Sequence, residues 1–324
     1  MIRPGTQAGS ILGPTPTRFL SDRFASRLDT LDEAPEPFRR ALAEHLADDS
    51  PHLLIYGPPW VSLKTRNPAT VLAVTNQRWL IAFDTPGGQA SVVQCDFANT
   101  LLVELTVILL YGQLRIEFVA GGPAQWAELQ FNTVMEKLYD EAVQLLLAGM
   151  EKTRLSVQAV NPDAELLRRN LPFTFQNALL KFTPRGQQAL DLVHWPACYG
   201  GKRRWFQHEL APEAALALTD RELLLISEEK TWSWLRIGHP NKYGNIVTHC
   251  PLSRLEGYHL SESRPLATLH LALRAGSAVG DMVQIALPFE HKAAVQEVVL
   301  RAFALKGKAS VATCTESYGQ SAPC

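Results

Sequence analysis

Two short stretches of the chain combine basic side chains with aromatic ones. They contain Trp60, Lys64 and Arg66 in the first case and Lys202, Arg203, Arg204 and Trp205 in the second. Fixed positive charge beside an aromatic ring that can lie at an interface is what a phosphate-bearing lipid head group requires. The same residues also fit solvated loops in which arginine side chains cover tryptophan rings. We treat both stretches as candidate ligand-binding sites.

A third stretch is rich in aromatic residues and has a different chemistry. It contains Trp232, Trp234 and Arg236. Tryptophan and arginine are enriched where protein partners bind most tightly, so this stretch is a candidate partner-binding surface. It could equally be an internal contact between two parts of the chain.

Residue patterns for catalysis are weak throughout the sequence. There is no Gly-x-Ser-x-Gly elbow, and no cysteine has a local nucleophile signature. Gly201-Lys202 and Gly307-Lys308 lack the first glycine of a phosphate-binding loop, and the histidines show no zinc-like spacing. The sequence therefore predicts no catalytic residue, no metal site and no cofactor.

Composition limits the class of protein further. The chain has 324 residues, with 31 lysines and arginines against 32 aspartates and glutamates. This balance provides no overall field for nucleic acid, and no nucleic-acid partner is expected. Five cysteines without paired short spacing indicate reduced thiols and a cytoplasmic location. The N-terminus lacks the apolar core of a signal peptide, and no apolar run is long enough to span a bilayer, so we expect a soluble protein.

Strand-like periodicity begins after residue 51 and continues for about 80 residues. It predicts strands at 52–56, 69–75, 78–84, 90–95, 100–110, 114–119 and 125–131, with Gly112 in one of the connections. Amphipathic helices are predicted at 37–47, before the strands, and at 133–147, after them. A further short helix is predicted at 19–31.

The same plan recurs in the second half of the chain. The hairpin 72–83 returns as 216–227, each with a short polar turn at Thr75 or Thr219. Further matches occur in the same chain order: 38–42 with 175–179, 54–58 with 192–196, Cys95 with Cys250, 114–118 with 269–273, and Phe131 with Phe289. An ordered series of this kind indicates internal duplication.

The repeated unit, seven antiparallel strands followed by a helix, resembles the pleckstrin-homology (PH)-like superfold. Its Thr-Asn-Gln-Arg and Thr-Asp-Arg turns are similar to those of the bacterial PH-like (YokE or GRAM-like) group. The fold class expected is mainly β with α: two tandem PH-like seven-stranded sandwiches or partly open barrels, each preceded by a short helix and closed by a C-terminal one. A lipocalin-like closed barrel is the rival. The expected boundaries are a flexible leader at 1–34, domains at 35–150 and 171–305, a linker at 151–170 and a flexible tail at 306–324.

The resemblance implies two kinds of function. PH-like domains commonly accept a peptide along a strand edge and the terminal helix, which favours a non-catalytic binding or scaffold protein with a protein or peptide partner. In lipid-binding PH domains the loop between strands one and two carries the basic ligands, which corresponds to Lys64 and Arg66 and to Lys202, Arg203 and Arg204. The alternative is therefore a peripheral membrane protein that binds anionic lipid head groups. Strand 69–75 lacks the basic residues that usually continue this pattern.

Overall fold

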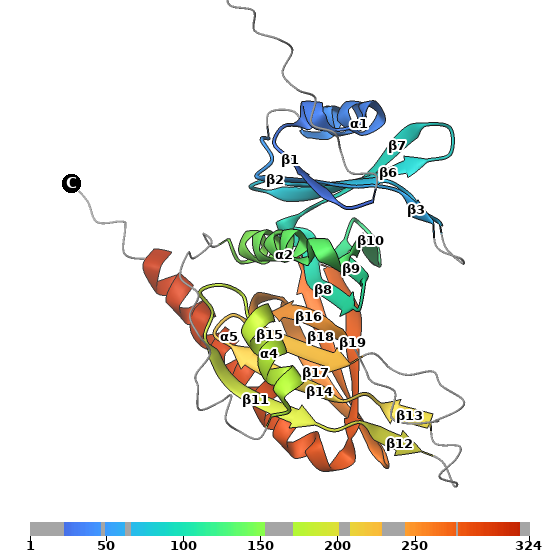
Figure 1. The fold of residues 1–324 in the computed structure, drawn as a ribbon. Helices are drawn as coiled ribbons and strands as arrows, with labels where there is room; N and C mark the ends of the chain where they lie inside the picture. The colour runs from blue at the N-terminus through green and yellow to red at the C-terminus, as the bar shows by residue number, and fades with distance from the viewer. Residues whose placement is uncertain are drawn as a thin grey trace, which may run out of the picture.

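The computed structural model describes residues 23–46, 49–61, 66–152, 171–200, 208–228, 244–276 and 278–317. In these ranges the protein is mainly β, with a few helices and several antiparallel sheets (Figure 1). No sheet of the described ranges closes on itself, because each strand order begins and ends with an edge strand.

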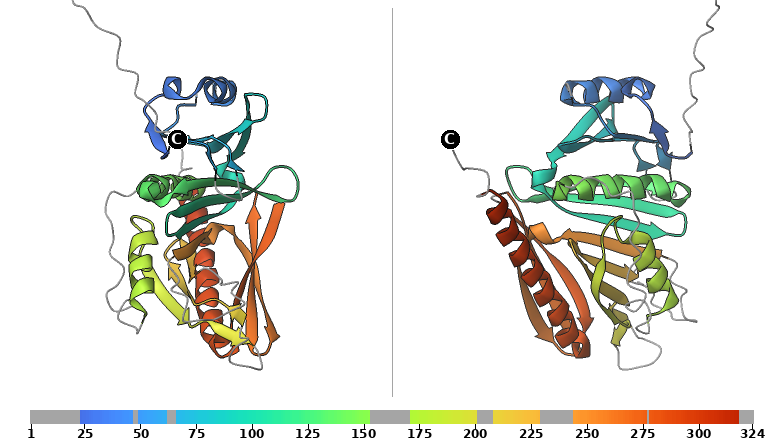
Figure 2. Two further views of the ribbon diagram at one scale, coloured as in Figure 1. Left: turned by 45° about the vertical axis from the view of Figure 1, so that its right-hand side comes forward. Right: turned by 90° about the vertical axis from the view of Figure 1, so that its left-hand side faces the viewer.

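The first half contains two helices and ten strands within its described residues. They are β1 (Ser26–Leu28), α1 (Glu36–Leu46), β2 (Leu53–Gly57), β3 (Trp60–Val61), β4 (Arg66–Asn67), β5 (Thr70–Val74), β6 (Arg78–Thr85), β7 (Gln89–Asp96), β8 (Thr100–Ile108), β9 (Tyr111–Val119), β10 (Ala124–Asn132) and α2 (Glu136–Glu151). The strands β1-β2-β5-β6-β7 form one sheet, in that order. The stripe of Phe38, Leu42 and Leu46 that predicted α1 is buried against it. Figure 2 shows α1 on the outer face of this sheet and α2 on its other side.

The second half repeats this order of elements. It contains α4 (Phe173–Phe182), β11 (Ala189–Trp195), β12 (Cys198–Gly200), β13 (His208–Ala211), β14 (Ala214–Thr219), β15 (Glu222–Glu228), β16 (Gly244–Pro251), β17 (Leu255–Ser263), β18 (Leu266–Ala275), β19 (Ala278–Pro288) and α5 (Lys292–Ser317). Strand β1 has no counterpart among the described residues of this half.

Strand register allows the matches between the two halves to be checked one by one. Cys95 lies opposite Trp79 in the first half, and Cys250 lies opposite Leu223 in the second. Trp79 and Leu223 hold the same place in the repeated hairpin, so the match between the two cysteines is confirmed. The match of Phe131 with Phe289 is wrong.

Register gives the physical reason for that correction. Leu129 lies opposite Leu114, and Ile285 lies opposite Leu269. Leu129 therefore corresponds to Ile285, and Phe131, two residues later, corresponds to Leu287, which is fully buried. A shared residue type two positions away produced the false match.

Strands from both halves form one sheet, which the sequence did not predict. Its order is β10-β9-β8-β16-β15-β14-β11. Residues 103–108 of β8 pair antiparallel with residues 244–249 of β16, and Leu105 lies opposite Val247. We call this pairing the joint. The two predicted domains are therefore continuous with each other through backbone hydrogen bonds.

Packing reinforces the joint. The largest core cluster combines Trp79 and Tyr139 of the first half with Phe175, Leu179 and Leu224 of the second. A second cluster consists mainly of residues from the second half but includes Leu101, Leu102 and Val119 of the first, and a third lies under α1. Burial of apolar surface thus holds the halves together in addition to strand pairing.

Three expected element boundaries differ from the structure. Ser26–Leu28 is a strand paired with β2 inside the range expected to be a leader, so the predicted helix at 19–31 is wrong at these residues. Strand β8 ends at Ile108, because Leu109 and Leu110 form the turn. Helix α5 continues beyond residue 305 to Ser317. The linker beyond Lys152 lies outside the described residues, and the domain boundaries stay predictions.

Gly112 does not form a connection but lies within β9. A Cβ atom there would come within 2.3 Å of the Phe131 ring, which in turn stacks on Tyr139 with a centroid distance of 3.8 Å. Glycine is required at this position by close packing and not by a turn.

Candidate functional site

The first basic stretch lies at a small hairpin. The backbone of Trp60 pairs with Asn67, and that of Val61 pairs with Arg66, which forms the two-stranded sheet β3–β4. Lys64 lies outside the described residues, as do the side chains of Trp60 and Arg66. The hairpin brings the two ends of the predicted binding stretch together without showing its charged groups.

The second basic stretch occupies the equivalent place. Strands β12 and β13 pair from Cys198 opposite Ala211 to Gly200 opposite His208. The predicted ligands that lie between these strands, and outside the described residues, are Lys202, Arg203, Arg204 and Trp205. Both basic stretches therefore occur at the ends of equivalent short hairpins.

The aromatic stretch with Trp232, Trp234 and Arg236 also lies outside the described residues. It connects β15 to β16, and β16 forms the joint with β8.

An open groove lies where edge strand β1 meets the first turns of α2. It has a volume of about 550 Å³ and is lined by Ala25, Ser26, Arg27, Val134, Met135, Lys137, Leu138 and Glu141. β1 ends its sheet, so one side of this strand has no hydrogen-bonded neighbour among the described residues. A strand edge beside a helix is the arrangement that accepts an extended peptide.

Charged side chains frame this β1–α2 groove. Arg27 Nη1 donates hydrogen bonds to both carboxylate oxygens of Glu141, at 2.8 and 2.9 Å. Both side chains are substantially exposed, so this ion pair positions the two elements but adds little to stability. Lys137 is exposed at the same rim. The rim thus suits a ligand that carries a carboxylate beside apolar groups.

Apolar side chains stand out into solvent next to the groove. Leu109, Leu110 and Val134 are 65, 68 and 65% exposed. Thr133 ties the helix start to the β8–β9 turn, because its N–H donates to the Leu110 carbonyl at 3.3 Å. Leu109 also has a positive φ of 51°, a conformation that costs energy for a branched side chain. Two leucines this exposed, one of them in a strained conformation, do not contribute to the core.

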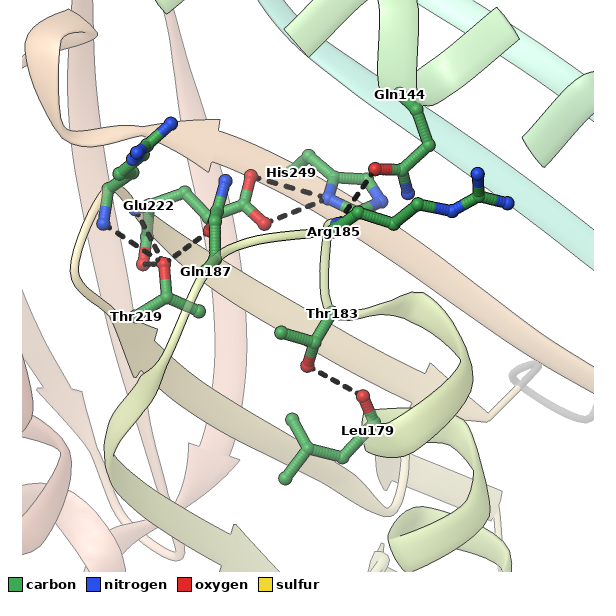
Figure 3. A network of polar contacts seen from close by, with 9 residues as sticks. Gln144, Leu179, Thr183, Arg185, Gln187, Thr219, Glu222 and His249 are labelled. Carbon is green, nitrogen blue, oxygen red and sulfur yellow. Dashed lines mark hydrogen bonds and ion pairs between the residues drawn. The ribbon is translucent and has the colours of Figure 1, made fainter. Parts of the chain in front are cut away.

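A buried polar network lies at the meeting of the two halves (Figure 3). The His249 Nδ1 atom lies 3.1 and 3.3 Å from the Glu222 carboxylate oxygens, and both side chains are only 1% exposed. Thr219 Oγ1 donates to Gln187 Oε1 at 2.6 Å. Buried polar groups need such partners, so the network fixes the relative positions of its elements.

The network extends to α2 of the first half. Gln144 Oε1 accepts a hydrogen bond from the Arg185 N–H at 3.0 Å. Burial raises the pKa of Asp140 on the same helix, while Gln144, Arg185 and His249 oppose that shift. Ligand access would require α2 or the segment after α4 to move, because His249 and Glu222 are fully covered. This network is better suited to holding the joint than to catalysis.

The described thiols are held in their protonated form. Burial raises the pKa of Cys95 to about 11 and raises the pKa of Cys250 further. Burial also raises the pKa of the less buried Cys198. Since the thiolate is the nucleophilic form, these environments disfavour cysteine chemistry. Across the described ranges, no group of three or more His, Cys, Asp or Glu side chains is placed to hold a metal ion.

Sequence reasoning missed the β1–α2 groove, although one signal was present. Leu109 and Leu110 are followed by Tyr111 and Gly112, and we read them as the end of a strand. Read as a turn, two adjacent leucines would have been anomalous, since turns favour glycine, asparagine and aspartate.

The described helices, including the 26 residues of α5, all lack the combination of length and apolar character that crossing a membrane requires. Comparison of the sequence with protein-family models found no match, and comparison with curated proteins found none either.

Proposed function

We propose that this protein is a non-catalytic binding or scaffold protein built from two PH-like units, and that it recognises a protein partner. The partner would place an extended, apolar segment with an acidic residue in the β1–α2 groove. Its backbone would add to the open edge of β1, and its acidic group would lie near Lys137.

The observation that carries this proposal is the exposed apolar surface beside an open strand edge. Val134, Leu109 and Leu110 are each more than half exposed, and the groove beside them is bounded by a helix and by β1, whose outer edge has no strand partner among the described residues. Contiguous exposed apolar surface with a polar rim commonly marks an interaction site. Removing these leucines and valine from water would favour binding.

The second candidate function is binding of anionic lipid head groups. It is favoured by the equivalent hairpins β3–β4 and β12–β13, each of which flanks a basic stretch of the sequence. Two weak sites on one chain would raise the overall avidity for a membrane. This function would depend on Lys202, Arg203 and Arg204 and would be strongly salt-sensitive.

One experiment with two arms separates the candidates. A random-peptide phage library is panned on the whole protein, and enriched peptides are measured against Val134→Asp and, as the matched control, Leu180→Asp on α4. Leu180 is also exposed and does not line the groove. We expect apolar, acidic peptides whose affinity falls about tenfold or more in Val134→Asp, equivalent to about 1.4 kcal/mol, and is unchanged in the control.

The second arm uses liposomes of phosphatidylcholine with phosphatidylserine at low and physiological salt. Salt-sensitive co-sedimentation that is lost when Lys202, Arg203 and Arg204 are neutralised would favour the lipid function instead. Failure to enrich any peptide that depends on Val134 would contradict the proposed partner site.

A further inference from the structure

The joint uses one edge strand from each half, and the equivalent edges are not used. In the repeated order β8 corresponds to β17, and β16 corresponds to β7. β17 ends the sheet β17-β18-β19, and β7 ends the sheet β1-β2-β5-β6-β7. Each has a single hydrogen-bonded neighbour in the part of the chain that the structure describes. One molecule thus carries the two strand edges, β7 and β17, that a second pairing of this kind would need, but they lie on different sheets.

Backbone geometry leaves the β7 edge competent to pair. The Phe97 N–H donates to the Gln77 carbonyl at 3.0 Å, directly after β7. Bonding direction alternates along an antiparallel strand, so the N–H groups of Ala90, Val92 and Gln94 point away from β6. A row of outward backbone groups is a template for a further strand.

Side chains at the free edges are compatible with the register of the joint. Val247 lies opposite Leu105 in the joint, and both are fully buried. Their equivalents, Val92 and Leu260, are only partly buried. Applying the same register gives the pairs Gln89–Ser263, Ala90–Glu262, Ser91–Ser261, Val92–Leu260, Val93–His259 and Gln94–Tyr258. No pair sets like charges opposite each other, and the central pair would bury two apolar side chains.

The flanking helices carry a complementary pair of charges. Across the joint, Lys181 of α4 and Glu136 of α2 form an ion pair at 2.5 Å. The equivalent residues are Glu44 of α1 and Lys292 of α5, so both charges are reversed. Lys292 already pairs with Glu262 within the chain, and Glu44 of a second copy would join that ion pair.

An exposed leucine occupies a position that the joint buries. Gln144 of α2 is 5% exposed, because the segment after α4 covers it. Its equivalent on α5 is Leu300, which is 50% exposed. An apolar side chain at this place is unexplained within one molecule, and a neighbour bound through the β17 edge would cover it.

We propose that copies of this chain associate head to tail, with the β7 edge and α1 of one molecule docking on the β17 edge and α5 of another. The contact would repeat the joint between molecules. Its two sides are different surfaces, so association is heterologous and produces either rings or open chains. This proposal is independent of the partner bound in the β1–α2 groove.

Variants that block one side each provide the test. Gln94→Pro removes an N–H of β7 that points away from β6, so no hydrogen bond between β6 and β7 is lost. Leu300→Asp places a charge on the α5 side of the proposed contact. The controls are Gln130→Pro on β10, an edge strand without a place in the joint, and Leu180→Asp on α4. In sedimentation velocity we expect the wild type and both controls to form species larger than a monomer as concentration rises. Each blocking variant should associate at least about tenfold more weakly than the wild type.

Mixing the two blocking variants keeps the test valid if either substitution lowers stability. Gln94→Pro retains its β17 side, and Leu300→Asp retains its β7 side, so an equimolar mixture should form a one-to-one dimer and nothing larger. A wild type that stays monomeric at all concentrations would overturn the proposal. So would assembly of both variants at wild-type strength, or a mixture in which no dimer forms.

Discussion

Glu104 is a charged residue placed where the two halves meet. It lies on β8, and its Oε2 atom accepts a hydrogen bond from Thr248 Oγ1 of β16 at 3.2 Å. Burial raises the pKa of Glu104, and the positive charge of Arg115 opposes the shift. Burial also raises the pKa values of Asp140 and Glu151 on α2. Burial thus shifts all three carboxyl groups toward their protonated forms.

The sign of the pH dependence follows from these shifts. An acid whose pKa is raised by folding binds more protons in the folded state than in the unfolded state. The free energy of unfolding therefore rises as the pH falls from above the raised pKa toward the unfolded value. Glu104→Gln should raise the free energy of unfolding where the buried carboxyl of Glu104 is ionised, and it should lose this advantage as the pH falls through the raised pKa and the carboxyl becomes protonated.

Urea unfolding at a series of pH values from neutral downward measures this effect. Glu290→Gln, at an exposed position before α5, is the control and should change the free energy of unfolding little. If Glu104→Gln is less stable than the wild type at about pH 7, the ionised form contributes to the joint through Arg115 and the argument from burial is wrong.

At the scale of elements, the repeated turn gives the clearest comparison between halves. Thr75 Oγ1 accepts hydrogen bonds from the N–H groups of Gln77 and Arg78, both at 3.2 Å. Thr219 Oγ1 accepts the equivalent bonds from Arg221 and Glu222 at 3.1 and 2.9 Å. Only Thr219 also donates to a buried side chain, the Gln187 oxygen described above.

Replacing each threonine with valine keeps its shape and removes the hydroxyl. We expect Thr75→Val to lower the free energy of unfolding by about 1 kcal/mol and Thr219→Val by about 2 kcal/mol or more. The difference arises because Thr219→Val leaves the buried Gln187 oxygen without its donor. Denaturant unfolding of both variants measures it, and equal losses would show that the Gln187 bond contributes nothing.

Elements were predictable where their residue pattern was local. The seven strands and two helices of the first half follow from alternating or helical periodicity, and their bounds differ by a few residues. β1 was missed because three residues, Ser26–Leu28, are too short for a period and their pairing with β2 is distant in sequence. The β1–α2 groove depends on that strand, so it could not be anticipated either.

At the scale of the whole molecule, duplication was visible in the sequence but the joint was not. Nothing in β8 or β16 alone specifies which edge pairs with which, because backbone hydrogen bonds carry no residue code. The joint also places Phe175 and Leu179 of α4 in the same core as residues of the first half. Two repeats that looked like independent domains are thus one packed unit.

A cleavage experiment tests whether the two halves form one unit. A site-specific protease sequence is inserted at residue 160 of the intact chain, and the folded protein is then cut there. We expect the two fragments to stay together and co-elute in size-exclusion chromatography, because strand pairing across the joint and a shared apolar core hold them. Association within a preformed interface of this kind does not require a covalent link. Leu105→Asp, which places a charge in that core, should allow the cut fragments to separate, while Leu180→Asp on the exposed face of α4 should not. Fragments of the wild type that separate on dilution would mean that the linker, and not the joint, keeps the two halves together.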